Sequence, residues 1–231
     1  MLTARFALAA LVAACTVSSL ARAADDLPPF SKVSEDFKEI TVSDQQGTKP
    51  LFHVWKRDKD SAMIGELPKN FAGKQYFIAL TLSSGDRYAG LQSGDWVVQW
   101  RRYDKRLALI VPNLDVRATG DAESKASVKR LFTDRVLLDV PILATGPHGG
   151  PVIDLDHLLV RHANSFFGAA IGRNVSQSRP LYSVPLAKVF PENVELAFEI
   201  VGNGDRLQTL HYSFSEVPDR SAGFKPRLVD E

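Results

Sequence analysis

The sequence predicts a mainly β protein, with antiparallel sheets arranged as a sandwich or an open barrel and with one or two short helices. Three observations carry this prediction. Apolar and polar residues alternate over several short segments, as expected for strands with one buried face. Gly, Asn, Asp and Pro residues separate these segments at short intervals. A chain of 231 residues, 45% of them hydrophobic, is long enough to bury a sizeable core in one or two domains.

The strand signals form three predicted hairpins and two further strands. The hairpins pair residues 51–57 with 62–67, 96–100 with 107–111, and 196–200 with 210–214. Residues 76–82 form the most apolar segment and are predicted to be a central strand. Residues 136–143 are placed at a sheet edge or a bulge, because Pro141 lacks the N–H that an inner strand needs.

The segments between the strands have different signals. Residues 117–127 are small and polar and are predicted to be a loop, as are the glycine-rich residues 145–151. Residues 156–164 have the apolar spacing of a short amphipathic helix. Residues 165–185 show no clear pattern.

The first 23 residues have the pattern of a signal peptide. Arg5 precedes an apolar stretch, residues 6–20, and the Ala-Arg-Ala of residues 21–23 is a cleavage signal. A second interpretation is a lipobox, in which Cys15 is lipidated and becomes the mature N-terminus. Both interpretations predict export to the periplasm or the extracellular space. The sequence after the leader has no apolar run long enough for a transmembrane helix.

Composition restricts what the exported part does. A polar lead-in is expected over residues 24–49, followed by one β-rich domain over residues 50–231. Cys15 is the only cysteine, so the sequence after the leader offers no disulfide, zinc–thiolate site or cysteine nucleophile. The net charge is +1 and the charges are scattered, so we expect no nucleic-acid partner.

Common catalytic and cofactor-binding motifs are absent from the sequence. It has no G-x-S-x-G elbow, no G-x-x-x-x-G-K-[ST] phosphate loop, no G-x-G-x-x-G and no H-E-x-x-H. We therefore predict no catalytic residue and no cofactor-binding residue in this chain.

Asp154, Asp156, His157 and His162 are the only weak candidates for a metal site. Helical histidine pairs that bind a metal are four residues apart. A spacing of five places two side chains about 140° apart around an α-helix. His157 and His162 are therefore expected to diverge, and no metal site is predicted. Asp156 serves equally well as the N-cap of the helix.

Two further patterns have structural and functional interpretations. His148-Gly149-Gly150 has the composition of an esterase oxyanion loop, but without a nucleophile elbow we interpret it as a flexible turn. Trp96 and Trp100 share one face of a predicted strand. Core packing is the first interpretation of this pair, and an exposed platform for sugar rings is the second.

Six motifs occur in order within residues 40–231. They are Leu51-Phe-His-Val-Trp-Lys-Arg-Asp, Ile64-Gly-Glu-Leu-Pro, Gly73-Lys-Gln-Tyr-Phe-Ile, Phe190-Pro-Glu-Asn-Val-Glu-Leu, His211-Tyr-Ser-Phe-Ser and Gly223-Phe-Lys-Pro-Arg-Leu-Val-Asp-Glu. Together they resemble the N-terminal domain of unknown function of bacterial exported EcxA-like zinc metallopeptidases, which are of the metzincin type. In that family the H-E-x-x-H-x-x-G-x-x-H zinc site lies downstream of the point that matches residue 231.

The resemblance implies a non-catalytic accessory or pro-region-like domain. The zinc ion and the catalytic residues belong to the downstream metallopeptidase domain, which is the implied partner, and none of them maps onto this chain. The chain is then a fragment, a truncated gene product or a stand-alone copy of the accessory domain, and an exposed apolar docking patch is expected. The alternative is a stand-alone envelope module that binds a glycan or a peptide through an exposed Trp96 and Trp100 face. A third hypothesis is a complete enzyme with an unrecognised site.

Overall fold

The computed structural model describes residues 27–43, 48–171 and 183–218. The predicted signal peptide of residues 1–23, including Cys15, and the motif beginning at Gly223 lie outside the described residues. Within the described ranges, no helix combines the length and the apolar character needed to cross a membrane.

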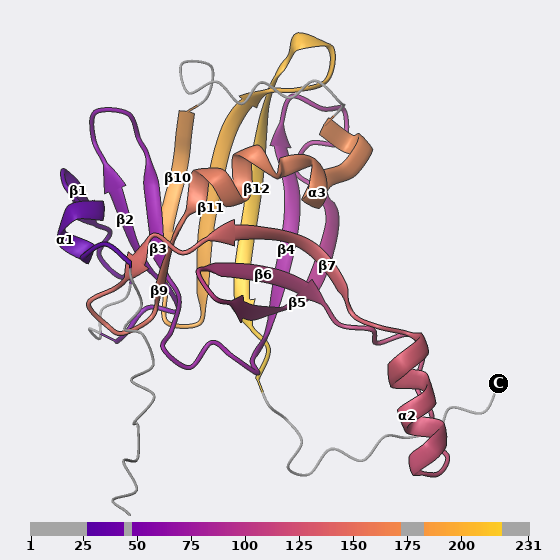
Figure 1. The fold of residues 1–231 in the computed structure, drawn as a ribbon. Helices are drawn as coiled ribbons and strands as arrows, with labels where there is room; N and C mark the ends of the chain where they lie inside the picture. The colour runs from indigo at the N-terminus through magenta and orange to yellow at the C-terminus, as the bar shows by residue number, and fades with distance from the viewer. Residues whose placement is uncertain (1–26, 44–47, 172–182, 219–231) are drawn as a thin grey trace, which may run out of the picture.

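The fold consists of two antiparallel sheets that share one hydrophobic core (Figure 1). The five-stranded sheet has the order β1 (Phe37–Glu39), β2 (His53–Arg57), β3 (Met63–Glu66), β9 (Pro151–Asp154) and β8 (Ala144–Thr145). The seven-stranded sheet has the order β10 (Ser183–Val189), β11 (Asn193–Val201), β12 (Leu207–Glu216), β4 (Gln75–Ser84), β5 (Gln92–Tyr103), β6 (Arg106–Val111) and β7 (Arg135–Pro141). The predicted mainly β, antiparallel fold class is therefore confirmed.

The predicted strand pairs are present in the structure. Hairpins β2–β3, β5–β6 and β11–β12 correspond to the three predicted hairpins. Strand β4 lies between β12 and β5, as expected for the most apolar segment. Strand β7 lies at the edge of its sheet and ends at Pro141. The predicted lead-in contributes β1, which pairs with β2.

Helical elements are short and lie outside the sheets. They are α1 (Phe30–Val33), α2 (Ala122–Leu131), a π-helical turn (η1, His157–Arg161), α3 (Ala163–Phe167) and the 3-10 turns η2 (Gly168–Ile171) and η4 (Asn203–Asp205). Helix α1 covers the outer face of the five-stranded sheet, where the ring of Phe30 packs edge-on against Trp55 at 5.0 Å.

One prediction for the connecting segments is wrong, and a second is correct only in part. Helix α2 occupies much of the segment predicted as a loop, residues 117–127. It begins at Asp121, whose carboxylate accepts a hydrogen bond from the N–H of Ser124 at 2.8 Å, as an N-cap does. The segment predicted as a helix, residues 156–164, is helical, but it consists of a π turn followed by the start of α3.

Tyr212 of β12 holds the π turn against the seven-stranded sheet. Its hydroxyl donates a hydrogen bond to the Leu159 carbonyl at 2.6 Å, and both groups are buried. The rings of Phe166 and Phe167 in α3 pack edge-on against the Tyr212 ring, each at 5.3 Å. The chain that carries His157 and His162 is thereby fixed on the core.

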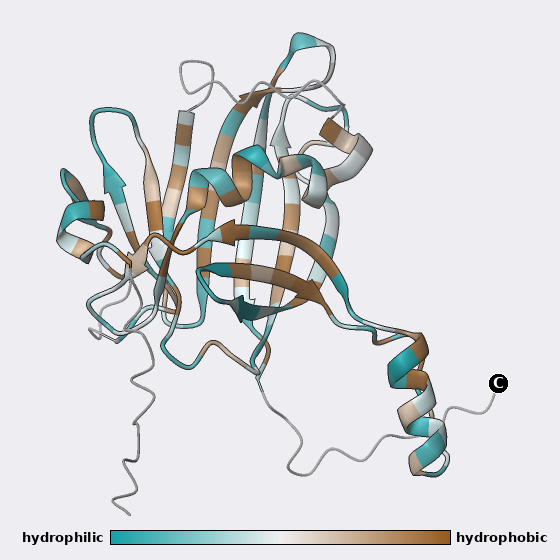
Figure 2. Cartoon of the chain, viewed as in Figure 1, coloured by the Kyte–Doolittle hydropathy of each residue, from teal (hydrophilic) through white to brown (hydrophobic). Residues whose placement is uncertain are grey.

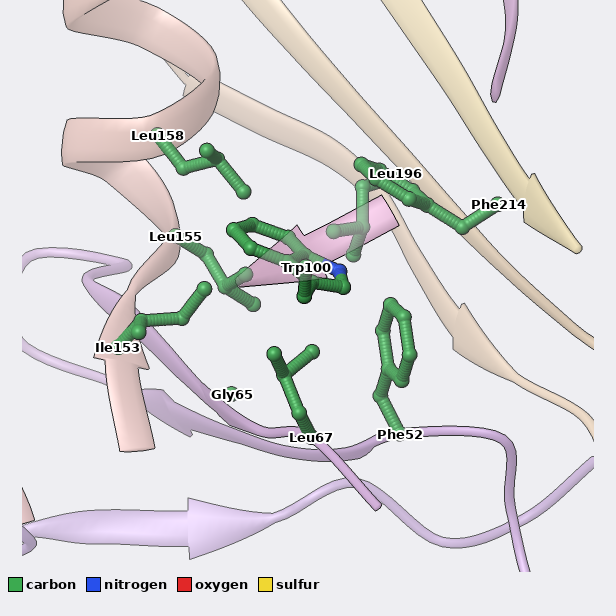
Figure 3. A pocket seen from close by; sticks show the side chains of 9 residues that line it. All are labelled: Phe52, Gly65, Leu67, Trp100, Ile153, Leu155, Leu158, Leu196 and Phe214. Carbon is green, nitrogen blue, oxygen red and sulfur yellow. The ribbon is translucent and has the colours of Figure 1, made fainter. Parts of the chain in front are cut away.

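A small apolar cavity lies between the sheets beside Trp100 (Figure 3). Its lining is formed by Phe52, Gly65, Leu67, Trp100, Ile153, Leu155, Leu158, Leu196 and Phe214. The indole nitrogen of Trp100 is buried and has no hydrogen-bond partner among the described residues. The space open to the centre of a water molecule is about 10 Å³, which is roughly what one water needs. The cavity is therefore too small for an organic ligand.

Candidate functional site

Two histidines and two glutamates gather on the outer face of the five-stranded sheet, and we call this group the histidine stack. The rings of His53 and His148 lie face to face, with centroids 3.5 Å apart and planes 8° apart. The Nδ1 atom of His53 is 2.7 Å from a carboxylate oxygen of Glu39. The Nδ1 atom of His148 is 2.9 Å from a carboxylate oxygen of Glu66.

Strand register explains three members of the stack. Residues two apart in a strand share a face, so His53 lies on the same side of β2 as Trp55. Glu39 of β1 is paired with Trp55, and Glu66 of β3 is paired with His53. The fourth member, His148, comes from the turn between β8 and β9, which closes over the sheet beside Glu66.

Glu66 organises this turn. Its side chain is fully buried, and one oxygen accepts hydrogen bonds from the backbone N–H groups of His148 at 3.0 Å and Gly150 at 2.8 Å. A Cβ atom on Gly146 would lie 2.2 Å from the Glu66 carboxylate carbon, so only glycine fits there. The predicted turn is present, but three hydrogen bonds to Glu66 anchor it, and the interpretation as a flexible turn is wrong.

The stack is better suited to holding strands together than to binding a metal. In each ring of the stack, Nδ1 is within hydrogen-bond distance of a glutamate, so Nε2 is the nitrogen that remains for a ligand or a proton. A metal ion shared by two imidazoles lies near the plane of both rings. Two rings that face each other at 3.5 Å have no such common position. The stack instead links β1, β2, β3 and the turn that contains His148.

His157 and His162 form a second histidine cluster, which we call the π-turn pair. Their ring centroids are 5.3 Å apart and their planes differ by 10°. The prediction that these side chains diverge is wrong. It assumed an α-helix, whereas a π-helix forms hydrogen bonds between residues five apart and brings such residues onto one face.

Burial and neighbouring charges change the pKa of His162. Its pKa is lowered from the ordinary value, first by partial burial and next by the neighbouring His157. Asp139 acts in the opposite direction, while Arg106 and Arg161 lower the pKa further. The net effect favours the neutral imidazole, whose unprotonated nitrogen has a free electron pair.

The two aspartates of the predicted group do not join the histidines. An oxygen of Asp154 accepts a hydrogen bond from the N–H of His157 at 2.9 Å, so Asp154, and not Asp156, caps this turn with its side chain. Asp156 is buried, and one of its oxygens accepts from the N–H of Met63 at 3.2 Å. Across the described ranges, no three His, Cys, Asp or Glu side chains are placed to hold a metal ion together.

Trp96 and Trp100 do not form an exposed platform. Trp100 is 2% exposed and points into the core. Trp96 is half-buried, its indole N–H donates to the Phe166 carbonyl at 3.3 Å, and the Arg135 guanidinium lies over its ring at 4.9 Å. Packing, and not sugar stacking, explains this pair.

The histidine stack was not predicted from the sequence. His53 and His148 lie far apart in the chain, so no spacing pattern links them. The one sequence feature that could have indicated the stack is Glu66, which ends a strand that is buried throughout. A buried carboxylate requires hydrogen-bond donors, so its presence predicts polar partners nearby.

Comparisons of this chain with protein-family models, with curated proteins and with solved structures returned no match.

Proposed function

We propose that this chain is a non-catalytic accessory domain of an exported zinc metallopeptidase, and that it docks onto a metzincin-type catalytic domain. The resemblance of its ordered motifs to the N-terminal domain of EcxA-like metallopeptidases supplies the partner. The observation that carries docking is a projecting helical arm whose apolar residues have no cover among the described residues.

The arm is the excursion between β6 and β7 that contains α2 (Figure 1). Helix α2 has ten residues and buries none of them. A helix of this length is marginal in water by itself, and most helices in proteins are stabilised by packing an apolar face. The arm therefore has the character of an element that is completed by a partner.

Hydrophobic residues lie where α2 joins β7, as the brown colour in Figure 2 shows. Large apolar side chains of this region are exposed. We call Leu114, Leu131, Phe132 and Val136 the arm patch. Their exposed fractions are 40%, 68%, 47% and 56%. The side-chain amide of Asn113 donates hydrogen bonds to the carbonyl oxygens of Val116 and Phe132. These bonds hold together the two chain segments that form the patch. Exposed large apolar side chains gathered in one region are typical of an interaction site.

Charged side chains lie beside the arm patch. Lys129 and Arg130 lie in the last turn of α2, and Arg135 begins β7. Interfaces usually combine an apolar centre with a polar rim of complementary charge. We therefore expect a charged rim around the matching surface of the catalytic domain.

Docking is tested with the purified chain and a separately purified H-E-x-x-H-x-x-G-x-x-H catalytic domain from the same organism. We expect a one-to-one complex by isothermal titration calorimetry, and weakening of at least about tenfold in L131D and F132D, because each places a charge in a buried apolar contact. Leu207 is also 56% exposed but lies at the start of β12, so L207D is the matched control and should bind like wild type. Equal weakening by L207D, or no effect of L131D and F132D, contradicts docking through the arm patch.

A further inference from the structure

We propose that His157 and His162 form a binding site for a divalent transition-metal ion, Zn²⁺ or Cu²⁺, with water completing the coordination. The proposal does not depend on the proposed function, because it concerns other residues and is tested with the metal alone.

Spacing is the first argument. Side chains four residues apart on an α-helix are about 5–6 Å apart at Cβ, and helical histidine pairs with this spacing bind zinc. The π turn also brings the two side chains of its His-x4-His sequence close together, with ring centroids 5.3 Å apart. The planes of the two rings differ by only 10°, so at least one ring has to rotate about the bond to its Cβ before both direct a nitrogen at a shared ion. This torsion has broad minima, and, unlike the rings of the histidine stack, neither ring is held by a carboxylate in the part of the chain that the structure describes.

The ring nitrogens of His157 and His162 are also available to bind a metal ion. In three of the five histidines, a ring nitrogen lies 2.7–2.9 Å from a carboxylate oxygen. These are His53, His148 and His211. In the part of the chain that the structure describes, the rings of His157 and His162 contact each other but have no hydrogen-bonded partner. Both side chains are half-buried, which leaves access for an ion and for water.

The ligands define the class of metal and the strength of binding. Neutral imidazole suits Zn²⁺, Cu²⁺ and Ni²⁺, whereas Mg²⁺ and Ca²⁺ prefer oxygen. Asp139, the nearby carboxylate, is engaged in an ion pair with Arg106. Structural zinc sites use four protein ligands and catalytic sites three. A two-histidine site is therefore expected to bind an exchangeable ion.

Titration of the purified full chain with ZnCl₂ or CuCl₂, followed by calorimetry in a non-chelating buffer, tests the proposal. We expect one ion per chain and a loss of affinity of at least about tenfold in both H157Q and H162Q. H211Q is the matched control, because its amide can still donate to Glu195, and it should bind like wild type. Thermal unfolding of each variant shows whether the fold is retained.

Two results would each overturn the proposal. One is absence of metal binding by wild type at millimolar metal, and the other is metal binding that H157Q and H162Q leave unchanged.

Discussion

Replacing Glu66 with alanine is expected to lower the free energy of unfolding by about 3–5 kcal/mol, because the change leaves several buried donors without an acceptor. The carboxylate accepts from two backbone N–H groups, those of His148 and Gly150, and from the His148 ring. Glu66 itself is 1% exposed, so water does not replace it readily. E66Q keeps an oxygen for the two N–H groups and is expected to lose about half as much.

Glu39 offers the matched control, because it binds the other ring of the same stack but its side chain is 46% exposed. Exposed ion pairs contribute roughly 0–1 kcal/mol, so E39A should remain within about 1 kcal/mol of wild type. Urea unfolding with linear extrapolation measures all three variants. If E66A were no less stable than E39A, Glu66 would not be what anchors the turn.

Replacing Gly150 with alanine is expected to destabilise the fold by about 3 kcal/mol or more. A Cβ atom at position 150 would lie 1.8 Å from the Leu67 carbonyl oxygen, which belongs to the backbone. Leu67 is itself held by a hydrogen bond from its N–H to the Pro151 carbonyl at 3.1 Å, so it cannot move away freely. Forced overpacking of this kind typically costs 1–3 kcal/mol, and a backbone clash costs more.

Gly94 is the control for this substitution. A Cβ atom there would meet only the Leu80 side chain, at 4.0 Å, which is an ordinary contact. G94A should therefore unfold at the wild-type temperature or slightly above it. Circular dichroism melting curves of G150A and G94A give the comparison, and equal midpoints would show that the turn does not approach β3 as closely as described.

The strands were predictable because a two-residue alternation reports directly on which face of a sheet is buried. Ile78, Leu80 and Leu82 of β4 and Leu210, Tyr212 and Phe214 of β12 all lie in the core. The turn residues between such segments then fixed the three hairpins. Burial and alternation are local signals, so they need no knowledge of distant partners.

The candidate sites were not predictable in the same way. Helix α2 has no buried face, so no apolar periodicity marks it. The π turn changes which residues share a face, and an α-helical wheel therefore placed His157 and His162 apart. The histidine stack depends on the pairing of β2 with β3 and on a turn elsewhere in the chain, which only the three-dimensional fold brings together.

A peptidase assay of the purified chain alone tests whether this chain is non-catalytic. The chain is incubated with excess ZnCl₂ and a mixed peptide substrate, and cleavage is followed by mass spectrometry. An accessory domain that relies on a separate catalytic domain should give no cleavage above the buffer control, even when zinc occupies the π-turn pair. Cleavage that disappears in H157Q, H162Q or H53Q would show that the chain is itself an enzyme and would contradict the account.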